Sequence, residues 1–83
     1  MNKVGFPCPC CGYLTISSEP PGTYEICPVC NWEDDIAQHN NPTLRGGANI
    51  VSLQEARQNY LKLGAICEQA RKWTREPYED ELP

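Results

Sequence analysis

Two copies of one short cysteine pattern constrain this 83-residue chain more than any other feature. The first copy reads Cys-Pro-Cys-Cys-Gly at residues 8–12, and the second reads Cys-Pro-Val-Cys-Asn at residues 27–31. The outer cysteines have the spacing C-x2-C-x15-C-x2-C, which lies in the range of four-cysteine zinc sites. Four thiolates complete the tetrahedral shell of zinc and leave no open position, as in structural rather than catalytic sites. The spacing therefore predicts one structural zinc ion per chain, bound by Cys8, Cys11, Cys27 and Cys30.

Other uses of these cysteines remain open. The same four ligands could hold an iron ion, although the two cysteine pairs of rubredoxins lie further apart. Thioredoxin-type pairs open a helix after a strand, and these two matched pairs do not. Cys10 lies too close to its neighbours to chelate well, so we expect either a packed side chain or a reactive thiol. Cys67 is expected to lie in a helix and to face the core of the domain, and a second metal site of Cys10, His39 and Cys67 is conceivable.

The length and net charge of the chain argue against several classes of protein. A chain this short buries a limited core, and a bound metal would supply stability that packing does not. The first residues show no apolar stretch typical of a signal peptide, and no stretch approaches the ~20 apolar residues of a membrane span. We therefore expect a cytoplasmic protein whose thiols stay reduced. The net charge of −4 argues against a protein held mainly by phosphate contacts.

The pattern of elements predicts a small α+β domain of the zinc-ribbon class. Residues 13–16 and 23–26 are β-prone and are expected to pair as a hairpin that joins the two cysteine turns. Ser52 and Glu55 form a capping-box pattern, which predicts a helix over residues 52–63 that ends at Gly64. A second helical segment is predicted near 66–74, and the alternative is one unbroken helix that tolerates Gly64. The domain is expected to span residues 1–74, and residues 75–83 to form an acidic, mobile tail.

The acidic run Trp32-Glu33-Asp34-Asp35 and the polar loop 38–49 follow the second cysteine turn. The simpler interpretation is a helical turn with acids at its positive end, Trp32 packed on the cysteine turn, and Arg45 paired with one of the three carboxylates. The functional interpretation is a recognition surface for a basic partner. An enzyme site using Glu33, Asp34, Asp35 and His39, of the hydrolase type, is a further alternative.

The chain resembles the small cysteine-rich proteins named for their CPCC motif. The resemblance rests on several stretches: residues 8–13, residues 24–30, the acidic run at 32–35, Arg45-Gly46-Gly47-Ala48-Asn49, and the helix pattern from Ser52 to Tyr60 that closes on Gly64-Ala65. It covers roughly residues 6–66. The resemblance implies that ribbon, acidic run, glycine pair and helix pack as one unit, and it implies no catalytic residue.

These observations favour a non-enzymatic zinc-binding protein that acts through protein–protein contacts. An inhibitor or immunity-type partner of a basic toxin or nuclease would fit the negative charge, because opposite charge speeds association. The alternatives are the hydrolase described above and a nucleic-acid-binding zinc ribbon that uses Arg71, Lys72 and Arg75.

Overall fold

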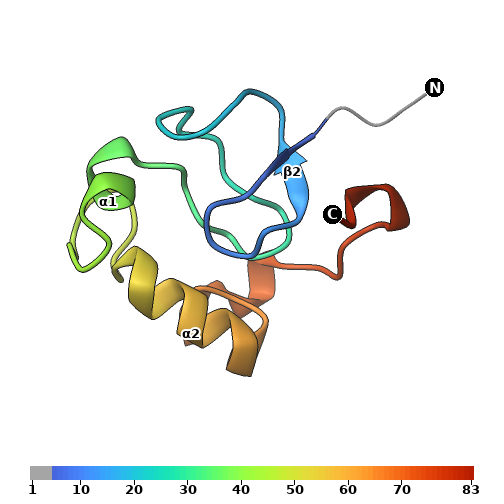
Figure 1. The fold of residues 1–83 in the computed structure, drawn as a ribbon. Helices are drawn as coiled ribbons and strands as arrows, with labels where there is room; N and C mark the ends of the chain where they lie inside the picture. Colours follow the sequence, from blue (N-terminus) through green and yellow to red (C-terminus); the bar gives the residue numbers. More distant parts are fainter. Residues whose placement is uncertain (1–4) are drawn as a thin grey trace.

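The computed structural model describes residues 5–83. Residues 1–4, which the predicted domain 1–74 includes, are outside this range. Two short strands, β1 (Phe6–Pro7) and β2 (Leu14–Ile16), precede the helices α1 (Ile36–Asn40) and α2 (Leu53–Leu63). Two 3-10 turns follow, η1 (Glu68–Trp73) and η2 (Glu79–Glu81). The cysteine turns lie between the strands and α2, with α1 at one end of the molecule and the C-terminal segment at the other (Figure 1). The expected small α+β fold is confirmed.

The predicted strand pairing is wrong. Strand β2 pairs antiparallel with β1, with Phe6 opposite Ile16, and not with residues 23–26. Residues 24–26 instead pair with 32–34, through an isolated bridge between Ile26 and Glu33 and a hydrogen bond from the Tyr24 N–H to the Asp34 carbonyl at 3.0 Å. Each cysteine turn thus reverses the chain inside its own short ladder. The length of the connection does not decide between the two pairings, because six residues (8–13) separate β1 from β2 and six (17–22) separate the predicted strands. The observed turn is closed by the hydrogen bond from the Cys8 N–H to the Tyr13 carbonyl at 2.9 Å.

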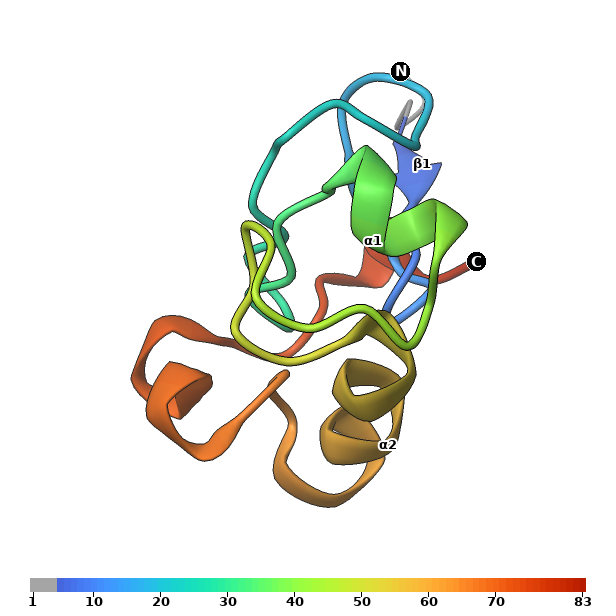
Figure 2. The same cartoon turned by 90° about the vertical axis from the view of Figure 1, so that its left-hand side faces the viewer.

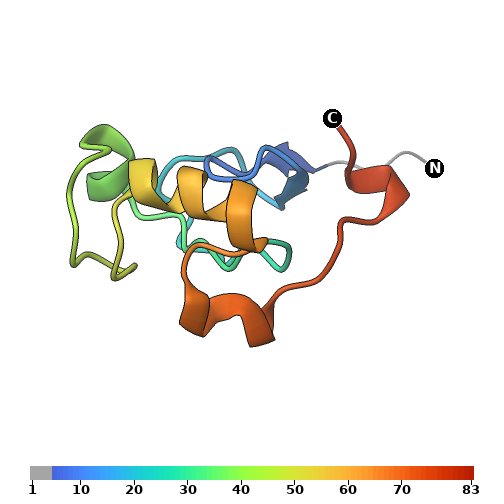
Figure 3. The same ribbon diagram turned by 90° about the horizontal axis from the view of Figure 1, so that it is seen from below.

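Helix α2 forms as its sequence predicts. The Ser52 hydroxyl accepts the Glu55 N–H at 3.1 Å, and the Glu55 carboxylate accepts the Ser52 N–H at 2.9 Å, so the capping box is confirmed. Gly64 ends the helix in the left-handed region at φ 74°. The second segment also forms, as the 3-10 turn η1. Figures 2 and 3 show the chain turning after α2 and running through residues 64–67 to η1, which lies apart from α2.

The core lies between the cysteine turns and the inner face of α2. Trp32 is its largest fully buried side chain, as the sequence interpretation requires. The other buried apolar residues are Cys8, Ile16, Cys27, Val29, Cys30, Val51, Leu53, Ala56, Ala65, Ile66 and Ala70, and Phe6 and Tyr60 pack partly buried against them. Three of the four predicted metal ligands therefore belong to the hydrophobic core itself.

The C-terminal segment lies along the body of the domain, with η2 against β2. The Arg75 guanidinium makes two hydrogen bonds of 2.9 Å to the buried Glu81 carboxylate and stacks 3.7 Å from the Tyr78 ring centroid. The carboxylate raises the pKa of Arg75 through these hydrogen bonds. Within the described residues, no helix is both long enough and apolar enough to cross a membrane.

Candidate metal centre

The two cysteine turns have the same backbone hydrogen bonds. In the first, the Cys8 N–H donates to the Tyr13 carbonyl at 2.9 Å, and in the second the Cys27 N–H donates to the Trp32 carbonyl at 2.9 Å. The N–H of Gly12 then returns to the Cys8 carbonyl, as that of Asn31 returns to Cys27. Gly12 (φ 83°) and Asn31 (φ 74°) both occupy the left-handed region, which glycine and asparagine tolerate best. The sequence prediction of two equivalent turns is thus confirmed.

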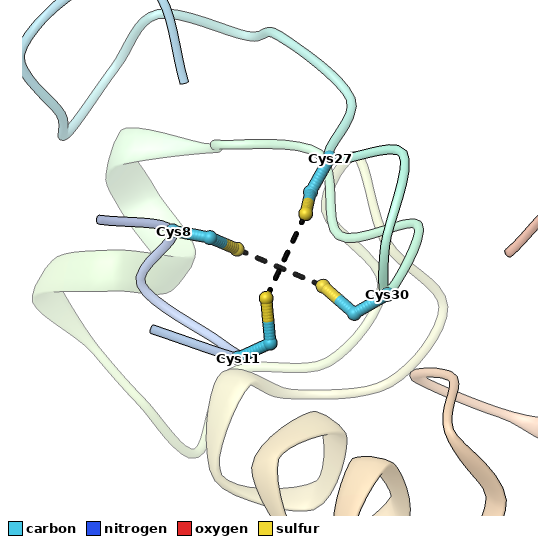
Figure 4. A group of neighbouring side chains, drawn as sticks. All are labelled: Cys8, Cys11, Cys27 and Cys30. Atoms are coloured by element: carbon cyan, nitrogen blue, oxygen red, sulfur yellow. Dashed lines mark hydrogen bonds between the residues drawn. The ribbon is translucent and has the colours of Figure 1, made fainter. Parts of the chain in front are cut away.

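The four predicted ligands point their sulfur atoms at one common centre (Figure 4). All four Sγ atoms lie within 4.8 Å of one another. The Sγ distances are 3.6 Å for Cys8 and Cys30 and 3.7 Å for Cys11 and Cys27. A tetrahedron with zinc–sulfur bonds of about 2.3 Å has edges of about 3.8 Å, so these two distances fit a bound zinc ion. They are far longer than a disulfide bond, and all six cysteines are free thiols.

Polar hydrogens around the sulfurs favour negative charge at this centre. The Cys10 N–H lies 3.4 Å from the Cys8 Sγ, and the Trp32 N–H lies 3.4 Å from the Cys30 Sγ, again one contact per turn. The Thr15 hydroxyl lies 3.0 Å from the Cys27 Sγ. Hydrogen bonds from the Cys11 thiol, and then from Cys30 and Cys8, lower the pKa of Cys27, whereas hydrogen bonds with neighbouring cysteines raise the pKa of Cys11 and Cys30. A divalent cation binds cysteine as the thiolate, so it would displace the protons that these thiols share.

Helix α2 and the segment after it hold the two turns together. The Arg57 guanidinium donates to the Pro9 carbonyl of the first turn at 2.9 Å. The Ile66 N–H donates to the Cys30 carbonyl of the second turn at 3.1 Å. The Tyr13 and Tyr60 rings meet edge to face at 6.4 Å. Helix α2 and the residues after it therefore cover one side of the four-cysteine centre.

The other candidate ligands do not join this centre. Among residues 5–83, the four cysteines are the one His/Cys/Asp/Glu group whose ligand atoms lie close enough together for a metal ion. Neither Cys10, His39 and Cys67 nor Glu33, Asp34, Asp35 and His39 come close enough together to hold a metal ion. Cys10 and Cys67 are half-buried against the core, and Cys67 immediately precedes η1 rather than lying within a helix.

The acidic run serves the fold rather than an open surface. Asp35 is buried and caps α1, because its carboxylate accepts the N–H groups of Ala37 at 2.7 Å and Gln38 at 3.1 Å. It also accepts the Ala48 N–H at 2.9 Å, and these hydrogen bonds, the Ala48 one foremost, lower the pKa of Asp35. Asp34 is buried as well and accepts both polar hydrogens of Thr23. The helical-turn interpretation is confirmed at Asp35, and only Glu33 keeps an accessible carboxylate.

The polar loop 38–49 is organised by Gln38, a residue that the sequence analysis did not single out. Its amide nitrogen lies 3.0–3.1 Å from the carbonyls of Leu44, Asn49 and Val51, and its amide oxygen accepts the N–H of Asn49 at 3.0 Å. The Asn49 side chain then holds the Glu33 N–H and carbonyl at 2.8 Å each. The sequence offered one signal for this network of hydrogen bonds, namely a polar loop of a length that is uncommon without internal structure.

Most of the basic residues that the sequence analysis singled out form ion pairs with carboxylates other than those expected. Arg45 contacts Glu55 at 2.9 Å, so the expected pairing with the acidic run is wrong, because Asp34 and Asp35 are already bonded to backbone groups. Of the three candidate nucleic-acid contacts, Arg71 pairs with Glu68 and Arg75 with Glu81. The Lys72 ammonium lies 5.5 Å above the Trp73 ring.

Comparison with curated proteins finds no match to this sequence. The sequence profile of the family described as Cysteine-rich CPCC matches residues 6–81, nearly the whole chain, including both cysteine turns, the loop and both C-terminal segments. The resemblance drawn from the motifs is thus confirmed and extends further along the chain than the motifs did. The protein belongs to the Cysteine-rich CPCC family.

Proposed function

We propose that this protein is a non-enzymatic zinc-binding protein whose metal is structural and whose activity is to bind another protein. The observation that supports this most directly is the closed group of four Sγ atoms within 4.8 Å of one another. Four thiolates leave zinc no open position for water or substrate. The metal then stabilises the fold, which places two turns and one helix in a fixed arrangement.

The buried carboxylates support binding over catalysis. A hydrolase that uses paired carboxylates would need a second acidic group beside Glu33, and Asp34 and Asp35 both accept hydrogen bonds from backbone N–H groups inside the fold. Nucleic-acid binding is disfavoured in the same way, because the Arg71 and Arg75 guanidinium groups pair with carboxylates and the chain carries a net charge of −4. The charge favours a basic partner protein, as for an inhibitor or immunity-type protein. The free cysteines fit a reducing, cytoplasmic location.

The metal part of this proposal is tested by elemental analysis of two cysteine variants. We expect wild type to carry one zinc ion per chain and Cys27→Ser to lose both the metal and the folded structure. Cys10→Ser is the matched control and should keep both, since Cys10 contributes no sulfur to the group. Iron in place of zinc, visible as a coloured protein, would correct the metal. A Cys10→Ser protein without metal would show that the ligand set is wrong.

The partner part is tested by capture from the native host followed by reconstitution. We expect a basic protein that, once purified, associates with the zinc-loaded chain at a rate that falls as salt increases. Capture of nucleic acid with a steep salt dependence would instead support the zinc-ribbon alternative.

A further inference from the structure

A groove of about 250 Å³ lies beside the second cysteine turn. Ile26 and Glu33 of the short ladder form one wall, Ile50 of the polar loop another, and Cys67, Gln69 and Trp73 the third. Three segments distant in sequence therefore meet around one hollow. Neither the metal centre nor the capping of α1 uses it.

The walls of the groove carry large apolar side chains that stand open to solvent. Ile26 is 57% exposed, Ile50 72% and Trp73 65%. Single exposed apolar residues are ordinary on protein surfaces, but a set gathered around a hollow is typical of a binding site. Trp is also the residue type most enriched among those that dominate binding energy.

Glu33 is the one charged side chain that lines the groove. Its backbone N–H and carbonyl are held at 2.8 Å by the Asn49 side chain, so its position is fixed. Its carboxylate has no hydrogen bond or ion pair within residues 5–83, and the residue as a whole is half-buried. A carboxylate next to apolar side chains is stabilised by a cation that arrives with the ligand.

We propose that this groove binds a short segment of a partner protein in which an apolar side chain stands next to a lysine or arginine. The apolar side chain would contact Ile26, Ile50 and Trp73, and the cation would pair with Glu33. The net charge of −4 would steer such a segment toward the surface. This proposal rests on the proposed binding function and names its surface and the chemistry of its partner.

A second copy of the chain fits the groove less well. In a two-fold interface the same surface patch faces itself, so two Glu33 carboxylates would be brought together. The lining of the groove contains no lysine or arginine to neutralise them. Self-association would thus bury a carboxylate without a counter-ion, which is costly.

The test uses the full, zinc-loaded chain and short capped peptides with glycine and serine flanks around the centres Leu-Lys, Leu-Gln and Ser-Lys. Binding is measured by fluorescence anisotropy of labelled peptides and located by the indole N–H signal of Trp73 in the NMR spectrum. The chain has two tryptophans, and Trp32 is buried, so its indole signal serves as an internal reference. We expect Leu-Lys to bind and to shift Trp73 but not Trp32. Leu-Gln should bind about two- to fivefold more weakly, which is the effect of losing one partly exposed ion pair, and Ser-Lys at least about fivefold more weakly, which is the effect of losing one apolar contact.

Variants assign the binding to the groove. Trp73→Ala should weaken Leu-Lys binding at least about tenfold, and Glu33→Gln should weaken it about two- to fivefold while leaving Leu-Gln unchanged. Leu61→Ala is the matched control, because Leu61 is exposed on the outer face of α2 and lies outside the groove. Glu33→Lys should reverse the preference and favour a Leu-Glu peptide.

Three results would overturn the proposal. They are no Trp73 shift at about 1 mM Leu-Lys peptide, binding that Glu33→Gln does not weaken, and a peptide-free, concentration-dependent Trp73 shift with the mass of two chains in sedimentation. The last would identify the groove as a homodimer interface. Zinc content is measured on the same samples and judged separately, so a chain without metal counts against the proposed function, and a loaded chain that ignores the peptide counts against the groove alone.

Discussion

Gly47 occupies a position in the polar loop that has no room for a side chain. A Cβ at this position would lie 2.7 Å from the Asp35 Oδ2 and 2.8 Å from the Gln38 Cδ, closer than side chains pack in proteins. Both neighbours are buried and hydrogen-bonded, so neither can move without breaking the cap of α1 or the contacts around Gln38. The glycine is needed here for close approach rather than for an unusual backbone angle.

Gly47→Ala should therefore destabilise the protein by about 1–3 kcal/mol, the range for overpacking a well-packed site. Gly46→Ala is the comparison, since a Cβ there meets nothing within 4 Å and the cost is only that of φ 77°, roughly 1–2 kcal/mol. Urea unfolding of the zinc-loaded proteins measures both. Equal stability of Gly47→Ala and wild type would show that the loop yields more readily than these distances indicate.

Among the elements, the two cysteine turns are equivalent although their sequences differ. Gly12 and Asn31 close them with the same backbone angle and the same return hydrogen bond. The position requires a residue that tolerates the left-handed region, and glycine does so without cost.

Asn31→Gly should thus leave the unfolding free energy within about 0.5 kcal/mol of wild type, whereas Asn31→Val should lower it by about 1–2 kcal/mol. Thermal unfolding with zinc in excess gives both values. A valine variant as stable as the glycine variant would contradict the left-handed geometry of the second turn.

Helix α2 depends on its N-terminal cap. Ser52→Ala removes the acceptor of the Glu55 N–H and should cost about 1 kcal/mol, as for other N-cap serines. Gln54→Ala, one position into the first turn and exposed, should change stability little. Denaturant unfolding of the two variants is the measurement, and a loss at Gln54 as large as at Ser52 would contradict the role of the cap.

These elements also show what the sequence could predict. The cysteine turns, the capping box and the Gly64 stop depend on residues within a few positions of one another, so their patterns determine the local structure. Residues 23–26 have a higher strand propensity than Phe6–Pro7, so propensity favoured the wrong partner for β2. The contacts of Gln38 and the pairing of Arg45 with Glu55 follow from how distant segments pack, and no local pattern encodes them.

For the whole molecule, the four-cysteine centre is the feature on which we expect the fold to depend. The buried apolar core is small and includes three of these four cysteines, so the side chains that could hold a metal are also those that fill the core. Without a cation, four thiols share this space, and any thiol that ionises leaves a buried negative charge without a partner. Structural zinc in small domains contributes roughly 10–16 kcal/mol at neutral pH, which is comparable to the whole stability of such a domain.

Removal and return of the metal test this dependence most directly. The zinc-loaded chain is labelled with ¹⁵N, treated with a chelator under reducing conditions, and then titrated with zinc while its NMR spectrum is recorded. We predict that the dispersed amide signals, including the indole signal of the buried Trp32, collapse when the metal leaves and return in full at one zinc per chain. A metal-free chain that keeps the dispersed spectrum would contradict the claim that this centre holds the fold.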